Sequence, residues 1–358
     1  MHRALDFYIE ISGKCNAKCP YCARQRFEQR YSGKNMSPGL FEQILNRLFE
    51  LELLDHDHVS TIKLYNWGEP FLNPEINEIL GILKKNELYA DVSSNFIVKP
   101  EIDKDLLPVI SGVILSLSGF SQDSYGKIHG AALDKVLENF EDFYEKIRRT
   151  APDTKISIAW HRYTFNESEL WQAYRYFDRP AISFLPAVAY LNDLPEMLSF
   201  TQGRLSETRQ RQAQSDLFLE HISQGLAYHK QRSKHYRCFM WDQLVIDENA
   251  QLLLCCGMNS FEREHVLGNI LEMSAEEILR KKSLDPICPI CIASGLPRAI
   301  AAIGRKPLPP GGKGDYIKFW SRFNLVDPSL SYLGSKFGAL IKDLPSGGSI
   351  FRKLRKLF

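Results

Sequence analysis

The chain's eight cysteines fall into two groups that lie far apart, and this distribution constrains the protein more than any other feature of its sequence. Cys15, Cys19 and Cys22 lie close together near the N-terminus, whereas residues 23–237 contain no cysteine. The remaining five follow in one later stretch: Cys238, Cys255, Cys256, Cys288 and Cys291. No apolar segment of signal-peptide length opens the chain, and the cytosol keeps thiols reduced. We therefore expect two separate metal sites rather than disulfides.

Residues 1–190 alternate short apolar or β-branched runs with longer helical patterns, which is typical of βα units around a parallel sheet. The strand candidates are residues 5–12, 60–66, 89–94, 109–116, 155–161 and 181–187. A helical apolar repeat is clearest over 133–149, and Ser37 followed by Pro38 marks the start of another helix. Six units are too few for a closed eight-stranded barrel, so the sequence predicts an α/β fold with a partial (β/α)6 barrel over residues 1–190.

Three further segments are expected after the barrel. Residues 191–235 are polar and helical, and we interpret them as a connector. Residues 236–296 contain a hairpin pattern that turns at Glu248 and Asn249, followed by a helix from about Ser274. This pattern predicts a small C-terminal auxiliary-cluster domain built from a β-hairpin plus a helix. Residues 297–358 form a tail with a different composition.

The first cysteine group follows the first strand, where barrel enzymes place their chemistry. A structural zinc site needs four protein ligands, and the nearest later histidine, His56, is distant in sequence. Three thiolates alone suit an iron-sulfur cluster with one iron left unclaimed. Three incidental loop cysteines are the alternative, although cysteines seldom cluster so closely without a metal.

Residues 15–22, Cys-Asn-Ala-Lys-Cys-Pro-Tyr-Cys, resemble the cluster motif of the radical S-adenosylmethionine (SAM) superfamily. Gly68, Glu69 and Pro70 after the second strand resemble that superfamily's Gly-Gly-Glu-Pro motif, with Trp67 in place of the first glycine. In the superfamily the backbone of this motif engages the amino group of SAM. The resemblance implies further cofactor-binding residues, namely Tyr21, Ser94, Asn95, Ser116, Ser118 and Arg162. A lone serine at a strand end is also a common turn residue.

The resemblance implies that a 4Fe-4S cluster binds SAM at its unclaimed iron. One electron, from a donor such as flavodoxin or ferredoxin, then cleaves SAM to a 5′-deoxyadenosyl radical, which removes a hydrogen atom from a substrate. Such a radical has to be shielded from water, which a barrel lumen does. Strand alternation puts Tyr8 with Glu10, and Ser116 with Ser118, on sides that are expected to face this lumen. An ordinary half-buried strand would show the same alternation.

The second cysteine group supplies enough thiolates for either zinc or an iron-sulfur cluster, because a Cys-x2-Cys pair serves both. The region resembles the SPASM or shortened "twitch" extension of some radical SAM enzymes, which binds auxiliary 4Fe-4S clusters. The resemblance implies one auxiliary cluster, with the ligands Cys238, Cys255, Cys288 and Cys291. Cys256 is left over as a core thiol, as the ligand in place of Cys255, or as a catalytic hydrogen-atom donor.

A fully ligated auxiliary cluster suits electron transfer, which favours dehydrogenation of a secondary alcohol on a sugar or cyclitol-like small molecule. If Cys256 returns a hydrogen atom, the same site would give epimerisation. A peptide-modifying enzyme that forms thioether crosslinks or oxidises side chains is the main alternative. A non-catalytic metal-binding scaffold is the second.

Residues 298–358 contain 12 Lys or Arg and 3 Asp or Glu, whereas the rest of the chain contains 33 and 40. Over residues 350–358 the apolar side chains fall on one helical face with cations around the other, as in an interfacial helix. The tail either binds an anionic membrane surface or acidic partner, or docks on the acidic body. No nucleic-acid motif is present. We expect a cytoplasmic protein, with peripheral membrane contact as the alternative.

Overall fold

The computed structural model describes residues 5–26, 33–56, 61–233, 236–259 and 265–303. Its centre is one nine-stranded sheet with the strand order β6-β5-β4-β3-β2-β1-β7-β8-β9. The first six strands are β1 (Asp6–Ile9), β2 (Thr61–Lys63), β3 (Tyr89–Ser94), β4 (Ile110–Ser116), β5 (Lys155–Arg162) and β6 (Ile182–Val188). They pair in parallel, each with its neighbour in sequence. The predicted partial (β/α)6 barrel is confirmed.

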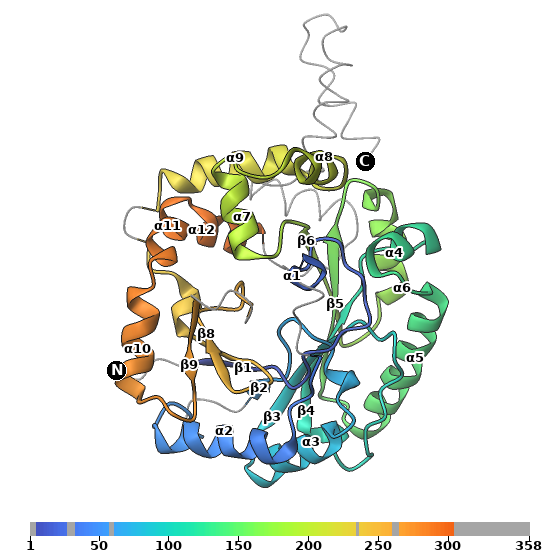
Figure 1. The fold of residues 1–358 in the computed structure, drawn as a ribbon. Helices are drawn as coiled ribbons and strands as arrows, with labels where there is room; N and C mark the ends of the chain where they lie inside the picture. The colour runs from blue at the N-terminus through green and yellow to red at the C-terminus, as the bar shows by residue number, and fades with distance from the viewer. Residues whose placement is uncertain (1–4, 27–32, 57–60, 234–235, 260–264, 304–358) are drawn as a thin grey trace, which may run out of the picture.

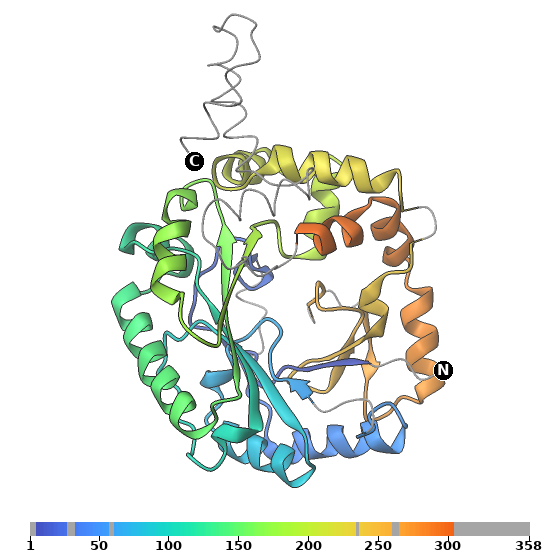
Figure 2. The ribbon, with the colours of Figure 1, turned by 180° about the vertical axis from the view of Figure 1, so that it is seen from behind.

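Five helices that follow these strands lie outside the curved sheet, as both views show (Figure 1, Figure 2). They are α2 (Pro38–Glu50), α3 (Ile76–Lys85), α4 (Gln122–His129), α5 (Leu133–Thr150) and α6 (Leu170–Phe177). The short helix α1 (Ala23–Arg26), which follows the first cysteine loop, lies inside this ring in Figure 1. Ser37 caps α2 by accepting from the Leu40 backbone N–H at 3.3 Å, as the Ser-Pro pair predicts. The apolar stripe of α5 is buried, and Phe140 and Phe143 each lie 5.5 Å from the ring centre of Phe96. Such aromatic packing fixes the helices against the sheet.

Three helices connect β6 to the last strands: α7 (Leu194–Thr201), α8 (Glu207–Asp216) and α9 (Leu219–Lys230). They confirm that the polar segment after the barrel is helical. In Figure 1 they run above the strands, from the end of β6 towards α11. They therefore cover the side of the partial barrel that its six strands leave open.

The predicted hairpin is present as β7 (Gln243–Ile246) and β8 (Gln251–Leu253), with its turn at Asp247–Ala250. It does not form a sheet of its own, because β7 pairs in parallel with β1 along the whole of both strands. A third strand, β9 (Val266–Asn269), which the sequence did not predict, pairs with β8. Boundaries at residues 190, 235 and 296 stay predictions, since one sheet runs through the first and third segments.

The segment after β9 contains α10 (Ala275–Leu284), capped by Ser274 as expected, then α11 (Ile287–Ala293) and α12 (Leu296–Ile303). The Cys-x2-Cys pair lies on α11. Cys288 and Cys291 are three residues apart, so the helix carries both on one face. Within the described ranges, no helix is long and apolar enough to cross a membrane. The predicted interfacial helix at residues 350–358 lies outside the described residues.

Candidate functional site

The loop that carries Cys15, Cys19 and Cys22 is fixed at the carboxyl ends of several strands by backbone hydrogen bonds. Gly13 N donates to Lys34 O at 2.8 Å, and Glu69 N donates to Lys14 O at 2.7 Å. Lys18 N donates to the carbonyl of His129 at the end of α4, at 2.9 Å. The loop therefore has a defined path before any cofactor binds.

The three thiols of this loop lie in a largely dehydrated pocket. Burial raises the pKa of all three, that of Cys22 to about 12, and the neighbouring thiols raise the pKa of Cys19 further. Cys15 accepts a hydrogen bond from Asn95 Nδ2 at 3.7 Å, and Cys19 Sγ lies 3.4 Å from His129 Nδ1. Thiols in such surroundings ionise when a metal group binds them.

The donor set of each cysteine group fits an iron-sulfur cluster. Among the described residues, no three His, Cys, Asp or Glu side chains converge to hold a single metal ion. The cysteine ligands of a 4Fe-4S cluster bind different irons and surround the cluster, so they need not converge on one point. Three soft thiols, with backbone N–H groups and an amide beside them, match this requirement and not that of a hard cation.

The Trp-Gly-Glu-Pro loop passes so close to the cysteine loop that only glycine fits at its second position. A Cβ on Gly68 would lie 1.8 Å from Ser12 O and 2.9 Å from Lys14 O. The buried carboxyl of Glu10 accepts from the backbone N–H groups of Trp67, at 2.7 Å, and Gly68. Trp67 Nε1 also donates to Met258 O at 2.8 Å. Glu10 and Trp67 therefore hold this loop despite the missing first glycine.

Glu69 joins this loop to the end of β3. Its carboxylate accepts from Asn95 N at 2.8 Å and from Phe71 N at 3.2 Å, at the start of the short 3-10 helix Pro70–Leu72. Burial raises the pKa of Glu69 to about 7 and that of Glu10 to about 8. Both acids have backbone partners, so they build the site's frame.

Two more of the predicted SAM contacts lie beside the cysteine loop. Ser94 Oγ accepts from Phe96 N at 2.9 Å, which is the hydrogen bond of a turn residue and not a contact to a cofactor. Asn95 Nδ2 contacts both Cys15 and Asn16, whose Oδ1 is 2.9 Å away. Asn95 is thus the residue of this pair whose side chain faces the cysteines.

The other predicted contacts lie at the ends of β4 and β5. Ser116 is partly exposed, with its hydroxyl 3.5 Å from that of Ser93. Ser118 is buried, and its Oγ lies 3.2 Å from Nδ1 of His161. Arg162 is also buried and pairs with Glu167 through two hydrogen bonds of 2.9 and 2.5 Å. A SAM carboxylate would have to compete with Glu167 for this guanidinium.

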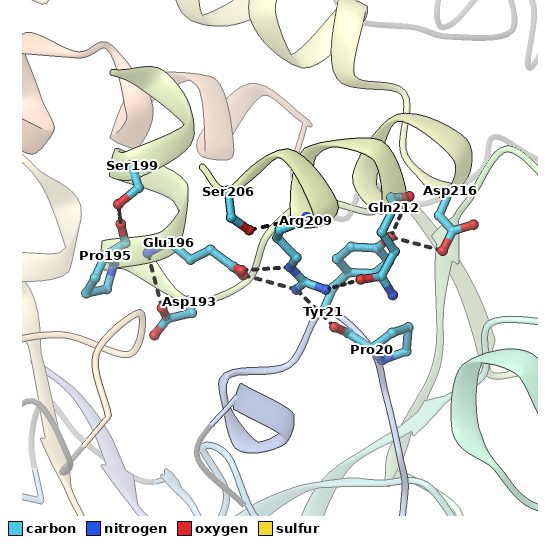
Figure 3. A network of polar contacts seen from close by, with 10 residues as sticks. All are labelled: Pro20, Tyr21, Asp193, Pro195, Glu196, Ser199, Ser206, Arg209, Gln212 and Asp216. Carbon is cyan, nitrogen blue, oxygen red and sulfur yellow. Dashed lines mark hydrogen bonds and ion pairs between the residues drawn. The ribbon is translucent and has the colours of Figure 1, made fainter. Parts of the chain in front are cut away.

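Tyr21 points out of the cysteine loop towards α8, as Figure 3 shows. Its hydroxyl donates to Asp216 Oδ2 at 3.0 Å and lies 3.2 Å from Gln212 O. The guanidinium of Arg209 lies 4.8 Å from the centre of the Tyr21 ring, and its Nη2 donates to Pro20 O at 3.0 Å. Arg209 in turn forms a bidentate ion pair with Glu196 of α7. Residues of the connector helices therefore hold Tyr21, which the resemblance assigns as a SAM contact, in this position.

All five later cysteines line one largely apolar cavity, with about 780 Å³ of empty space including its open mouth. Cys255 and Cys256 come from the turn after β8, Cys288 and Cys291 from α11, and Cys238 from the start of a short 3-10 helix. The five thus converge from three separate segments. Four thiols around a largely apolar cavity fit a fully ligated cluster.

Two residues that sequence reasoning missed shape this cavity. Trp241 Nε1 donates to Cys288 Sγ at 3.5 Å. Lys282 of α10 is 3% exposed, and its ammonium donates to the carbonyls of Gln243, at 2.6 Å, and Leu254, at 2.8 Å. The burial of Lys282 lowers its pKa, while the surrounding thiols oppose this. The sequence did not indicate this role, because a single lysine in an amphipathic helix pattern is usually a solvent-exposed residue.

The fifth cysteine differs from the others in its contacts. Cys256 Sγ lies 3.5 Å from Met240 Sδ, and its electrostatic partners are Lys282, Cys238 and Lys63 of β2. Those of Cys255 include Cys291. Both adjacent thiols reach the cavity, so the assignment of Cys255 as the ligand stays a prediction.

Comparisons with known proteins agree with this architecture. The family model of the radical SAM superfamily matches residues 9–177, and that of the SPASM iron-sulfur cluster-binding domain matches residues 238–289. Two curated proteins called "probable GTP 3′,8-cyclase", from Methanococcus vannielii and Methanococcus maripaludis, are 30% identical over 140 and 144 residues. These matches span 38% and 39% of this chain and 44% and 46% of the relatives, so less than half of each relative is covered.

Solved structures show the same fold. Hexahistidine-tagged anSMEcpe with bound AdoMet superposes with a TM-score of 0.51 at 16% identity, over 96% of this chain and 97% of that one. Native anSMEcpe with bound AdoMet and a Cp18Cys peptide gives a TM-score of 0.50 at 16% identity, over 78% and 82%.

The chain belongs to the radical SAM superfamily. More particularly, it is a radical SAM enzyme with a SPASM-type C-terminal extension, and it uses SAM, a 4Fe-4S cluster and an auxiliary iron-sulfur cluster. The observed sheet, with its strand order and its added hairpin, is the frame in which both cofactor sites are held.

Proposed function

We propose that this enzyme oxidises a secondary alcohol carbon of a sugar or cyclitol-like small molecule. Its first cluster would be held by Cys15, Cys19 and Cys22, and its auxiliary cluster by Cys238, Cys255, Cys288 and Cys291. When bound, the first cluster and SAM supply a radical that removes a hydrogen atom, and the auxiliary cluster accepts the remaining electron. With a proton lost to solvent or a base, the alcohol is oxidised by two electrons.

The observation that carries this proposal is the single cavity that five cysteines line. Four of them are enough to complete an auxiliary cluster, and a cluster without an open iron position serves electron transfer and not substrate binding. The strand β7, which lies between Cys238 and Cys255 in the chain, is directly beside β1, and β1 leads into the first cysteine loop. Both cofactor sites therefore rest on neighbouring strands.

The inner wall of the barrel supports a hydroxyl-rich substrate. Tyr8, Lys63 and Asp91 pair across β1, β2 and β3, and they are partly exposed on the face opposite the buried row that Phe7 begins. Lys63 Nζ lies 4.6 Å from the centre of the Tyr8 ring and pairs with Asp6 at 3.0 Å. Alternating donors and acceptors on such a wall suit a polyol more than an apolar group.

The first test is iron content and SAM cleavage under anaerobic reduction. We expect about eight irons per chain, and about four after Cys15, Cys19 and Cys22 are changed together to Ala. Cys19→Ala alone should abolish 5′-deoxyadenosine formation. Zinc in place of iron in the triple variant would show that the second site was misassigned.

The second test asks which reaction follows SAM cleavage. Incubation with a library of polyols, sugars and peptides, read by mass spectrometry, should yield a product about 2 Da lighter than a polyol, since a two-electron oxidation removes two hydrogens. Cys288→Ala should still form 5′-deoxyadenosine without this product. Normal product yield from Cys288→Ala would overturn the electron-acceptor role, and a modified peptide would favour a maturase.

Epimerisation is the second candidate, because Cys256 reaches the same cavity and interacts with Lys63 on the barrel wall. A thiol there would return a hydrogen atom to the opposite face of the substrate carbon, and one electron from the auxiliary cluster together with one proton would restore the resulting thiyl radical to a thiol. In that case the product has unchanged mass, and Cys256→Ala accumulates an oxidised or off-pathway species. Unchanged rate and stereochemistry in Cys256→Ala would return this cysteine to a packing role.

A further inference from the structure

His129 is a buried histidine that contacts a cluster cysteine although the two residues are 110 positions apart in the chain. It is the last residue of α4 and is 4% exposed. Its Nδ1 lies 3.4 Å from Cys19 Sγ, within hydrogen-bonding range for sulfur. Its Nε2 is buried and has no hydrogen-bond partner among the described residues. The imidazole therefore directs its one polar contact at Cys19.

The backbone, and not only the side-chain rotamer, fixes this contact. The His129 carbonyl accepts from Lys18 N at 2.9 Å, so the end of α4 is bonded to the residue before Cys19. Gly130 ends the helix in the left-handed region, at a φ of 70°, and a Cβ there would lie 3.1 Å from the side chain of Lys18. The end of α4 and the cysteine loop are thus packed closely together at His129 and Gly130.

The ring is also held from the side. Tyr125, one helical turn earlier, lies with its ring centre 4.5 Å from that of His129 and the planes 32° apart. The Tyr125 hydroxyl is buried without a hydrogen-bond partner in the described part of the chain. Its contribution to His129 is therefore packing, which a phenylalanine would keep.

A thiolate that binds iron has no proton and only accepts hydrogen bonds, whereas an imidazole nitrogen can donate. Hydrogen bonds to the sulfurs of an iron-sulfur cluster help to set its reduction potential. They withdraw charge from sulfur, which stabilises the reduced and more negative state. We propose that Nδ1–H of His129 donates to Cys19 and raises the reduction potential of the SAM-binding cluster. This inference rests on the proposed assignment of Cys19 as a ligand.

The test is an EPR-monitored redox titration of the anaerobic holoenzyme, following the cluster whose reduced signal changes when SAM is added. His129→Leu removes the donor, while His129→Asn places an amide nitrogen near the position of Nδ1. We expect His129→Leu to shift the ratio of reduced to oxidised cluster about tenfold towards oxidised at fixed potential, or about 59 mV for one electron. His129→Asn should restore most of that shift.

Tyr125→Phe is the matched control, because it keeps the ring that packs against His129 and removes only the hydroxyl. Its potential should equal that of the unaltered enzyme. An equal shift in Tyr125→Phe and His129→Leu, or no shift in His129→Leu with full iron content, would overturn the proposal. EPR evidence of a nitrogen bonded directly to a cluster iron, in a cluster whose signal does not change with SAM, would make His129 a ligand. That result would also overturn the proposal. If the unaltered enzyme shows no EPR signal that changes when SAM is added, the result would count against the proposed function itself.

Discussion

The hydroxyl of Tyr21 donates a 3.0 Å hydrogen bond to the carboxylate of Asp216, which lies 195 positions later in the chain. Asp216 also accepts from Lys127 of α4 at 2.8 Å, so the cysteine loop, α4 and α8 meet at one carboxylate. Burial, together with the charge of Asp216, raises the pKa of Tyr21, which keeps its phenol protonated as a donor. The aromatic residue of the cluster motif thus ties the loop to the connector helices.

Tyr21→Phe should lower the stability of the protein without weakening SAM binding. The ring would keep its packing against Tyr163, 5.9 Å away, and Arg209, while the hydrogen bond to Asp216 is lost. We expect a loss of about 1 kcal/mol, measured by urea unfolding under anaerobic conditions. SAM affinity, measured by calorimetry, should be unchanged. A large loss of SAM affinity at unchanged stability would instead show that Tyr21 contacts SAM.

Gly68→Ala should disrupt the site, because its methyl group would collide with backbone that cannot move aside. The carbonyls of Ser12 and Lys14 both lie within 3.0 Å of the added Cβ. We expect a loss of several kcal/mol in stability or no folded protein, with SAM binding lost in whatever folds. Gly39→Ala in α2 is the control, since nothing lies within 4 Å of its Cβ. It should be neutral or stabilise by up to about 1 kcal/mol.

The stability of the protein should fall as the pH rises from about 4.5 to 8 because of Glu10. Burial raises its folded-state pKa to about 8, above the ordinary value of 4.5. As the pH rises, the unfolded chain therefore releases this proton at a lower pH than the folded protein does. The stability that the neutral form of Glu10 contributes is complete below pH 4.5 and is lost as the pH rises to about 8. The buried acids Glu69 and Glu248, with pKa values raised to about 7, act in the same direction at lower pH.

Glu10→Gln isolates this effect, because an amide oxygen still accepts from Trp67 and Gly68 but does not titrate. The slope of unfolding free energy against pH between 7 and 8 should flatten by up to about 1.4 kcal/mol per pH unit. Urea titrations at several pH values would measure it. Identical slopes in both proteins would show that Glu10 is ionised throughout.

Two adjacent lysines of α10 should respond very differently to removal. Lys282→Met leaves the carbonyls of Gln243 and Leu254 without their buried donor, at a cost of about 2 to 3 kcal/mol. Lys281 is about one-third exposed, pairs with Glu277 at 3.0 Å and donates to Leu267 O at 2.7 Å. Because water can replace the lost donor at this partly exposed position, Lys281→Met should cost only about 1 kcal/mol. Thermal unfolding compares the two. Equal costs would mean that Lys282 is not the support of the cysteine cavity.

Much of this architecture could be predicted, and the exceptions have physical reasons. Alternating apolar runs predicted all six barrel strands, because each buries one face against helices. The third strand β9 was missed because Val266–Asn269 is short and contains Gly268, which weakens a strand pattern. The Cys-x2-Cys spacing gave no indication of a helix, whereas α11 carries both cysteines and accommodates Pro286 at its N-cap and Pro289 in its first turn.

The site divides in the same way. Cysteine spacing and the Gly-Glu-Pro residues are local, so the sequence alone indicated where the chemistry lies. The roles of Asp216 and His129 depend on packing between segments more than 100 positions apart, which no local pattern encodes. The ion pair of Arg162 with Glu167, five positions later, was not anticipated either, and the assignment of Arg162 as a SAM contact stays a prediction.

The parallel pairing of β7 with β1 has a consequence for how the enzyme can be divided. Without β7, one whole side of β1 would present unpaired N–H and C=O groups, directly below the cysteine loop. Such an open sheet edge recruits other chains and aggregates. A barrel fragment that ends before residue 236 should therefore fail as an independent unit. The C-terminal extension therefore supplies a strand that completes the sheet of the barrel. Exchanging the extension between relatives would require a β7 that pairs with the recipient's β1, as well as the cysteines.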